Sequence, residues 1–128
     1  MDIRTHLKID KEFSGTPIKL EEGYAEVLLK TSVKMAADEK GLLHGGFIFS
    51  CGDYSAMLAV NHPNVVLAGA SVKFLKPVKV GDEIICRAKV EEDKGNKKTV
   101  KVECFKGDVK VFEGIFYTVI PEKHVLEK

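Results

Sequence analysis

Hydrophobic and polar positions alternate along most of this chain, and one segment breaks the alternation. Between Glu22 and Met35 hydrophobic and polar residues alternate, which is typical of a strand. Later segments also have strand-like patterns: 65–75, 83–91, 99–105 and 109–120. Between these strands, residues 77–82, 92–97 and 106–108 carry turn-forming residues. The pattern therefore predicts about five strands, mostly antiparallel because tight turns join the later ones.

The segment that breaks the alternation runs from Gly45 to about Asn61 and has the length of a helix. It is apolar on nearly every side, so we expect the rest of the protein to enclose it. Pro63 cannot continue the helix and marks its end. Residues 1–19 are predicted to form a lead-in with one short helical turn, and residues 36–43 a connection. Gly114, in the middle of the last strand, suggests a bulge or a close approach of backbones.

These elements predict an α+β fold in which a curved sheet of about five strands wraps around one central helix. The chain has 128 residues, which is enough for one domain with one core. We therefore expect a single domain over residues 1–128. An open sheet has two edges, and such edges can pair with a second copy of the chain.

Composition narrows the possible partners. The net charge is +1, so there is no long-range field that would favour nucleic acid. No run approaches the roughly 18 apolar residues of a membrane span, and the N-terminus lacks the apolar block of a signal peptide. We expect a cytoplasmic protein with no nucleic-acid or membrane partner.

Cysteine and histidine positions indicate neither an oxidised scaffold nor a metal site. Cys51, Cys86 and Cys104 are odd in number, far apart in the sequence, and form no CxxC pair, so we expect three reduced, mostly buried thiols. The four histidines are dispersed and have no ligand spacing, so no metal is assigned.

The start of the predicted helix carries His44-Gly45-Gly46. Glycines here leave the first backbone N–H groups bare, and the helix dipole adds partial positive charge. Such a helix end suits an oxyanion or a polarised carbonyl. The simpler alternative is that the glycines only let the chain turn tightly into a buried helix.

Asp53 lies well inside this helix. Most aspartates at such positions face water, but the neighbours of Asp53 one turn away include Phe49 and Met57, which leave little room for a wet face. A carboxyl group in apolar surroundings has a raised pKa, which suits it to general-base work. Gly45 and Asp53 are eight residues apart, roughly 12 Å along a helix. One reacting carbon could not contact both groups of the same chain, so a shared site would combine Asp53 of one subunit with Gly45 of another.

The run His44-Gly45-Gly46, with an acid nine positions after the histidine, resembles the hotdog-fold acyl-CoA thioesterase superfamily. Phe74-Leu75-Lys76-Pro77 and Val80-Gly81-Asp82 add to the resemblance, which extends from about residue 23 to residue 120 and is greatest to the PaaI-type and THEM2-like branch. It implies a hydrolase of acyl-CoA thioesters, active as a homodimer or homotetramer, with no cofactor because coenzyme A is part of the substrate. It also implies roles for three residues. The Gly45 amide would polarise the carbonyl, Asp53 of the other subunit would be the base or nucleophile, and His44 would shape the loop.

Other candidate site residues follow from the same resemblance. Asp38 stands where relatives often have an asparagine that orients water or substrate, and Ser71 or Ser50 is a candidate for a hydroxyl that some relatives carry near the acid. Further candidates for binding substrate are Gly46 at the helix start, Phe47 and Met57 beside an acyl tunnel, and Lys73 and Lys76 near the phosphates of coenzyme A.

The main alternative is a non-catalytic acyl-CoA-binding module, like the ligand-sensing hotdog domains of some transcription regulators. Asp53 argues against it, as does the lack of an attached DNA-binding segment in the sequence. A hotdog dehydratase is disfavoured because no histidine stands at the position of Asp53, and a serine hydrolase because there is no GxSxG motif. The sequence leaves the acyl group open.

Overall fold

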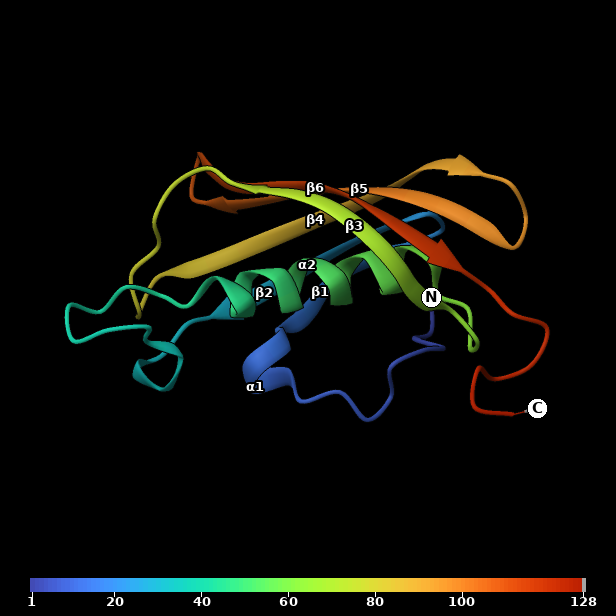
Figure 1. Ribbon diagram of the computed structural model, residues 1–128, viewed down its shortest axis with the longest axis horizontal. Helices are drawn as coiled ribbons and strands as arrows, with labels where there is room; N and C mark the ends of the chain where they lie inside the picture. The colour runs from blue at the N-terminus through green and yellow to red at the C-terminus, as the bar shows by residue number, and fades with distance from the viewer. Residues whose placement is uncertain (128) are drawn as a thin grey trace.

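The computed structural model describes residues 1–127, which form one six-stranded sheet against one long helix (Figure 1). The predicted hotdog architecture is confirmed, with six strands rather than five. In chain order the elements are α1 (Lys11–Ser14), β1 (Thr16–Glu21), β2 (Tyr24–Lys30), the 3₁₀ turn η1 (Val33–Met35), α2 (Gly45–Val60), β3 (Val66–Phe74), β4 (Glu83–Asp93), β5 (Lys97–Lys106) and β6 (Val109–Val119).

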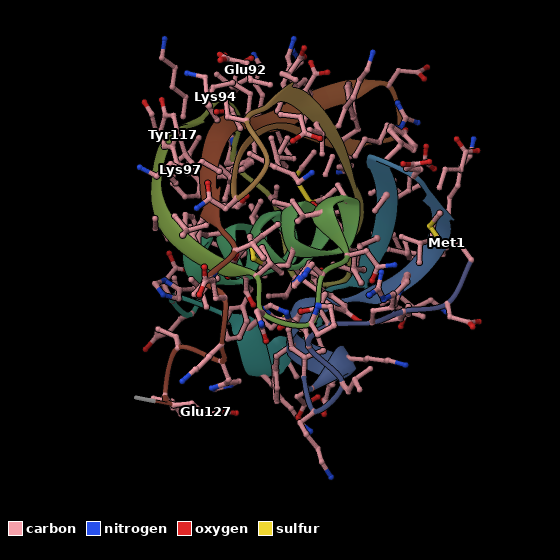
Figure 2. The ribbon with its side chains drawn as sticks, turned by 90° about the vertical axis from the view of Figure 1, so that its right-hand side faces the viewer. Met1, Glu92, Lys94, Lys97, Tyr117 and Glu127 are labelled. Atoms are coloured by element: carbon pink, nitrogen blue, oxygen red, sulfur yellow. A yellow bond between two sulfur atoms is a disulfide. The ribbon has the colours of Figure 1, made fainter. Side chains whose placement is uncertain are left out.

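The strand order is β1-β2-β4-β5-β6-β3, and every neighbouring pair is antiparallel. β1 and β3 are therefore the two edges of the sheet. Viewed toward the end of α2, the sheet curves around the helix and encloses it on one side (Figure 2). This curvature leaves the two ends of the helix at the two open ends of the sheet.

α2 is buried along most of its length because its sequence offers almost no polar face. Nine of its sixteen residues are buried, and it contacts all six strands through small and apolar side chains. Gly52 brings the helix close to the sheet, since a Cβ there would lie 3.3 Å from the Phe112 ring and 3.4 Å from Val102. The helix ends at Asn61, which adopts the left-handed conformation of a helix cap.

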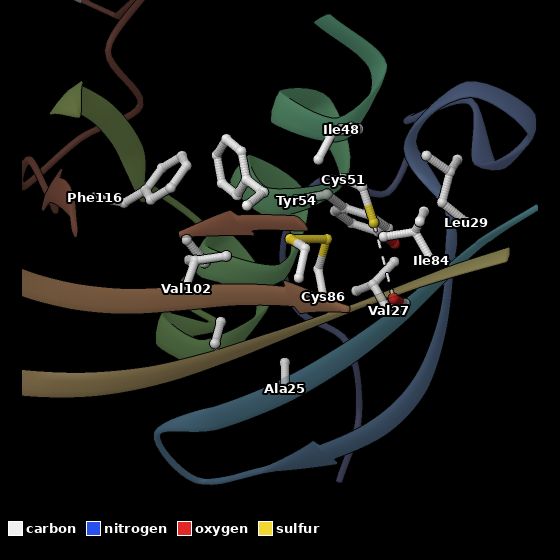
Figure 3. Packing of buried hydrophobic residues seen from close by; sticks show 14 of the residues in the cluster. Ala25, Val27, Leu29, Ile48, Cys51, Tyr54, Ile84, Cys86, Val102 and Phe116 are labelled. Atoms are coloured by element: carbon white, nitrogen blue, oxygen red, sulfur yellow. Dashed lines mark hydrogen bonds between the residues drawn. A yellow bond between two sulfur atoms is a disulfide. The ribbon is translucent and has the colours of Figure 1, made fainter. Parts of the chain in front are cut away.

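The hydrophobic core lies between α2 and the concave face of the sheet (Figure 3). Alternate residues of β2 supply fully buried side chains, as do those of β4, β5 and β6, which agrees with the period of two in the sequence. Gly114 of β6 faces this core, and a Cβ there would lie 2.6 Å from Val72 Cγ1 and 3.1 Å from the Ser71 carbonyl oxygen. Of the two alternatives for Gly114, the structure shows the close backbone approach.

Two parts of the N-terminal half differ from the sequence prediction. The lead-in contains the predicted helical turn, α1, but it is followed by an edge strand, β1, that the sequence pattern did not predict. The strand expected over residues 22–35 ends at Lys30, because the chain then turns out of the sheet. Thr31 fixes this exit, since its backbone N–H and its Oγ1 both donate to the Asp82 carbonyl oxygen, at 3.1 and 2.6 Å.

The prediction of three reduced thiols was wrong. Cys86 on β4 and Cys104 on β5 are directly opposite each other and form a disulfide in the core (Figure 3). Only the register of the sheet makes them neighbours, since they are 18 residues apart in the sequence. Cys51 on α2 is free and buried, and burial raises the pKa of its thiol to about 12.

Among residues 1–127, no helix is both long enough and apolar enough to cross a membrane.

Candidate active site

Asp53 projects from the C-terminal half of α2 into a pocket of about 350 Å³. The pocket is lined by Thr5 and His6 of the N-terminal segment, by Pro63 and the residues that lead into β3, and by His124. The Asp53 carboxyl is half-buried, and its Oδ1 atom is buried with no hydrogen-bond partner in the described chain. Burial raises the pKa of this carboxyl to about 6.

A buried carboxyl oxygen without a partner is unfavourable in a folded protein, because it has lost its hydrogen bonds to water and has no hydrogen bond within the protein to replace them. The fold nevertheless holds Asp53 in this state at the edge of an open pocket. Because Asp53 lines the pocket, its carboxyl group can accept a proton or a hydrogen bond from a molecule that enters. A pKa near 6 lets the group exchange protons close to neutral pH.

The N-terminal segment forms part of the wall of this pocket because Asn61, at the end of α2, holds it in place. Asn61 Oδ1 accepts from the Arg4 backbone N–H at 2.7 Å, and Asn61 Nδ2 donates to the Asp2 carbonyl oxygen at 2.8 Å. On the other side, Asn64 Nδ2 donates to the carbonyl oxygens of Pro121 and Glu122, both at 3.3 Å. The N-terminal segment and the segment that follows β6 therefore both lie near the C-terminal end of α2 (Figure 1).

Gly45 lies at the opposite end of α2, in a second pocket of about 250 Å³. Apolar residues dominate its lining, among them Ile48 and Phe74, and Lys76 is the one charged residue in it. A Cβ at Gly45 would lie 2.9 Å from Phe74 Cε1, so the glycine leaves room for this ring beside the helix start.

His44 precedes the helix without capping it through its side chain. Its backbone N–H donates to the Met35 carbonyl oxygen at 2.9 Å, and its exposed ring packs edge-on against Phe47 at 5.9 Å. A Cβ at Gly46 would lie 2.8 Å from His44 Nε2, so this glycine makes room for the ring. Within residues 1–127 the amides of Gly45 and Gly46 donate to no acceptor. The start of α2 therefore presents free N–H groups, as the sequence indicates.

Asp53 and Gly45 thus open into different pockets of the same chain. The Asp53 pocket borders the start of β3 through Val66 and Leu67, whereas the Gly45 pocket borders the end of β3 through Phe74. A single chain does not bring the carboxyl and the helix N-terminus together. This agrees with the separation of roughly 12 Å along the helix expected from the sequence.

The remaining candidate residues are spread over the molecule. The Asp38 side chain is exposed, and its Oδ1 accepts from the backbone N–H groups of Lys40 and Leu42, at 2.9 and 3.2 Å, so it shapes its own loop. Met57 is fully buried in the core, Ser50 bonds to Ser14 at 2.8 Å, and Phe47 packs on Phe13 as well as on His44. Ser71 and Lys73 line a separate depression on the sheet, away from Asp53 and Gly45, while Lys76 is in the Gly45 pocket.

Apart from Asp53, none of the residues that line this pocket was predicted as a site residue from the sequence, and the polar ones are Thr5, His6 and His124. They come from the two ends of the chain, where no pattern in the sequence marks them as neighbours of a helix residue. Histidine and carboxylate side chains are common metal ligands. In residues 1–127, however, no group of three His, Cys, Asp or Glu side chains is placed to hold a metal ion.

Comparison with protein families gives one match. The family model of the thioesterase superfamily matches residues 40–113. This range includes both Gly45 and Asp53.

Two curated proteins illustrate how the chain relates to longer ones. It is 76% identical over 119 residues, 93% of its length, to a methylthioribose-1-phosphate isomerase of Aquifex aeolicus, but covers only 26% of that protein. It is 30% identical over 118 residues to the transcription factor FapR of Caldanaerobacter subterraneus subsp. tengcongensis, covering 91% of this chain and 59% of FapR. The chain therefore spans a quarter to about three fifths of these relatives, and their names do not by themselves describe the matched segment.

Solved structures agree on the fold. Protein PH1136 of Pyrococcus horikoshii superposes with a TM-score of 0.98 at 52% identity, covering 99% of this chain and 98% of that one. The PaaI protein from the phenylacetic acid degradation operon of E. coli superposes with a TM-score of 0.81 at 21% identity, covering 89% and 84%. The second likeness supports the fold alone.

Proposed function

Because this chain belongs to the thioesterase superfamily, we propose that it hydrolyses acyl-CoA thioesters to a free acid and coenzyme A. The catalytic unit is a homodimer with two composite sites. In each site, Asp53 of one subunit activates water, and the Gly45 amide of the partner subunit polarises the thioester carbonyl.

The observation that carries this proposal is the state of Asp53. Its Oδ1 is buried without a partner at the edge of a pocket, and burial raises the pKa of the carboxyl to about 6. A carboxylate that serves only the fold would be expected to have its oxygens paired. An unpaired acceptor with this pKa is suited to take a proton from water near neutral pH.

The two edges of the sheet differ in a way that favours dimerisation through β3. β1 has six residues and is protected by Pro17, by the charges of Lys19 and Glu21, and by a register shift after Pro17. β3 has nine residues and no proline, and Lys73 is its one charged residue. Its last residue, Phe74, and the residue that follows, Leu75, are exposed apolar side chains. A long, weakly charged edge of this kind can pair with a second copy of itself.

Antiparallel pairing of two β3 strands would also complete the site. The Asp53 pocket borders the start of β3, and the Gly45 pocket borders its end. In an antiparallel pair, the start of one strand lies beside the end of the other. Asp53 of each subunit would then face Gly45 of the partner subunit, at two equivalent positions related by the two-fold axis.

The proposed reaction uses these groups in one sequence of bond changes. Asp53 takes a proton from water, and the resulting hydroxide bonds to the thioester carbon. Negative charge moves to the carbonyl oxygen, where the free amides of Gly45 and Gly46 and the helix dipole stabilise it. The carbon–sulfur bond then breaks, coenzyme A leaves as a thiolate, and this thiolate recovers the proton held by Asp53.

The substrate-binding roles follow from the Gly45 pocket. Its apolar lining suits the acyl chain of the substrate near the reacting carbon. Lys76, which also lines this pocket, is the candidate partner for a phosphate of coenzyme A. Lys73 and Ser71 lie in a different depression of the sheet, so their proposed contacts are with more distant parts of coenzyme A.

A second candidate function is binding of acyl-CoA without hydrolysis. The similarity to FapR, which is named a transcription factor, favours it. The two functions share the pocket and differ in whether Asp53 does chemistry.

Release of thiol from a panel of acyl-CoAs of different chain length, together with an aryl-acetyl-CoA, tests the proposal. We expect turnover by the wild-type protein and a loss of roughly a hundredfold or more in Asp53→Asn, the usual scale for a general base. Tight binding of a thioether analogue, with no thiol released from any member of the panel, would reject hydrolysis and favour the binding function.

A further inference from the structure

His6 shares the Asp53 pocket and has no part in the reaction described so far. Its half-buried ring lines the pocket together with Thr5, whose side chain is buried. His6 Nδ1 and Thr5 Oγ1 form a hydrogen bond of 2.7 Å. The ring also lies 6.3 Å from the ring of Tyr54, the residue that follows Asp53 on α2. The histidine is therefore held at the pocket rather than swinging free in solvent.

The backbone of His6 is strained at this position. Its φ is 56°, and among residues 1–127 the one other non-glycine residue with positive φ is Asn61. Asparagine and histidine are both enriched in this region, but a non-glycine residue stays there only with support from its surroundings. The two hydrogen bonds between Asn61 and the backbone of Asp2 and Arg4 provide that support. Strain maintained in this way is common at functional sites.

The His6 ring and the Asp53 carboxyl face one pocket without touching each other. No hydrogen bond joins them, and Asp53 Oδ1 has no partner within residues 1–127. Burial lowers the pKa of His6 and raises the pKa of Asp53, so it favours the neutral form of each group. Both residues line one open pocket, which a small molecule can enter.

We propose that His6 is a catalytic residue of this thioesterase, and that its Nε2 accepts a hydrogen bond from the water that Asp53 deprotonates. The proposal rests on the function proposed above. It gives the N-terminal segment, which lies outside the residues that match the family model, a direct part in the reaction.

The tautomer required for this role is compatible with the hydrogen bond to Thr5. With the proton on Nδ1, His6 donates to Thr5 Oγ1 and leaves Nε2 as an acceptor. A water molecule between the two groups would then donate one hydrogen to Asp53 and the other to His6. Because both hydrogens are held, a lone pair of the water oxygen is directed at the thioester carbon. No proton moves to His6, which orients the water while Asp53 removes the proton.

His124 is the other histidine of the pocket, and it is less suited to this role. Its side chain is exposed, and its Nδ1 already accepts from the backbone N–H of Leu126 at 3.0 Å. His6 has the buried partner and the constrained backbone that His124 lacks.

Two substitutions distinguish the role of Nδ1 of His6 from the role of Nε2. In His6→Asn the side-chain amide can replace Nδ1 in the bond to Thr5, and asparagine tolerates the positive φ, but nothing reaches the position of Nε2. In His6→Gln the longer side chain places its amide near the position of Nε2. We expect kcat to fall at least tenfold in His6→Asn with KM changed less than threefold, and His6→Gln to recover part of kcat.

His62→Asn is the matched control, because His62 is a half-buried histidine at the same end of α2 that does not line the pocket. Its Nδ1 accepts from the Asn64 backbone N–H, a bond that asparagine can also make. This variant is expected to keep wild-type kcat and KM. Thermal unfolding of all three variants checks that the fold is retained.

The controls also distinguish failure of this proposal from failure of the proposed function. If the wild type is active, Asp53→Asn is inactive and His6→Asn keeps wild-type kcat, the role of His6 is rejected and the thioesterase stands. If both His6 variants lose activity equally and melt earlier than the wild type, His6 is structural and the proposal is again rejected. If the wild type releases no thiol from any substrate, the proposed function fails and the role of His6 with it.

Discussion

Asp53 and Gly45 lie on the same helix but open into separate pockets at its two ends. Because the helix is rigid, no rotation of side chains can close a gap of roughly 12 Å between a carboxyl and a backbone amide. The two groups can act on one thioester only if they come from different subunits. This relationship makes the proposed function and the proposed dimer parts of one hypothesis, and the predictions below follow from it.

The rate of hydrolysis should depend on the ionisation of Asp53. The base must be deprotonated to accept a proton from water, and burial raises its pKa to about 6. We therefore expect kcat/KM to rise with pH through about 6 and to level off above pH 7. The measurement is the pH profile of thiol release with a soluble acyl-CoA. A profile that is flat from pH 5 to 8 would exclude Asp53 as the base.

The same shift predicts that Asp53 lowers the stability of the fold above its pKa. The pKa is about 6 in the folded chain, against an ordinary value of 3.8, so between these values the folded state holds more protons than the unfolded state. Stability contributed by the protonated group is thus lost as pH rises from about 4 to about 6. At one pKa unit per 1.36 kcal/mol, the full difference is at most about 3 kcal/mol.

Removal of the charge should restore this stability. We expect Asp53→Asn to raise the free energy of unfolding by about 1–3 kcal/mol at pH 8 and to have little effect at pH 4. Urea unfolding of both proteins at the two pH values checks this. An equal or lower stability of the variant at pH 8 would mean that the carboxylate has a favourable partner in the folded protein.

The Cys86–Cys104 disulfide predicts one free thiol in the oxidised protein. Denatured without reductant, the chain should react with a thiol reagent once, at Cys51, and after reduction three times. The disulfide closes a loop of 18 residues, so we expect its reduction to lower the free energy of unfolding by about 3 kcal/mol. A Cys51→Ala variant is the control, because it should give no reactive thiol before reduction. Three reactive thiols in the unreduced wild type would contradict the assignment.

The pattern of hydrophobic and polar positions was sufficient to predict the helix and strands that have one face or all faces buried. The helix from Gly45 to Val60 and the four later strands have the predicted limits within one or two residues. β1 was missed because it is an edge strand with Pro17 near its start, and most of its residues are exposed. It has no apolar face strong enough to show in the sequence.

The relationships between distant residues were harder to predict. Cys86 and Cys104 become neighbours through the register of β4 and β5, which the sequence does not specify. His6 approaches Asp53 because Asn61 holds the N-terminal segment, and that contact joins residues 57 apart in the chain. By contrast, the separation of Gly45 from Asp53 followed from the fixed rise of a helix, so it could be predicted without the fold.

The most direct test of the composite site is complementation between two inactive subunits. Gly45→Pro removes the Gly45 N–H, and proline is well accepted at the first position of a helix. The preceding residue, His44, already has a conformation that proline permits (φ −67°, ψ 126°). Gly45→Ala is the matched control, since it adds a Cβ near Phe74 but keeps the N–H. We expect Gly45→Pro and Asp53→Asn each to be nearly inactive, and Gly45→Ala to keep more activity than Gly45→Pro.

The measurement is thiol release after the Gly45→Pro and Asp53→Asn proteins are unfolded together in equal amounts and refolded. About half of the dimers should then be mixed, and each mixed dimer has one site with both Asp53 and Gly45 intact. We expect recovery of about a quarter of wild-type activity per subunit. Activity no higher than the sum of the two separate variants, in a mixture shown to contain mixed dimers, would contradict a site shared between subunits.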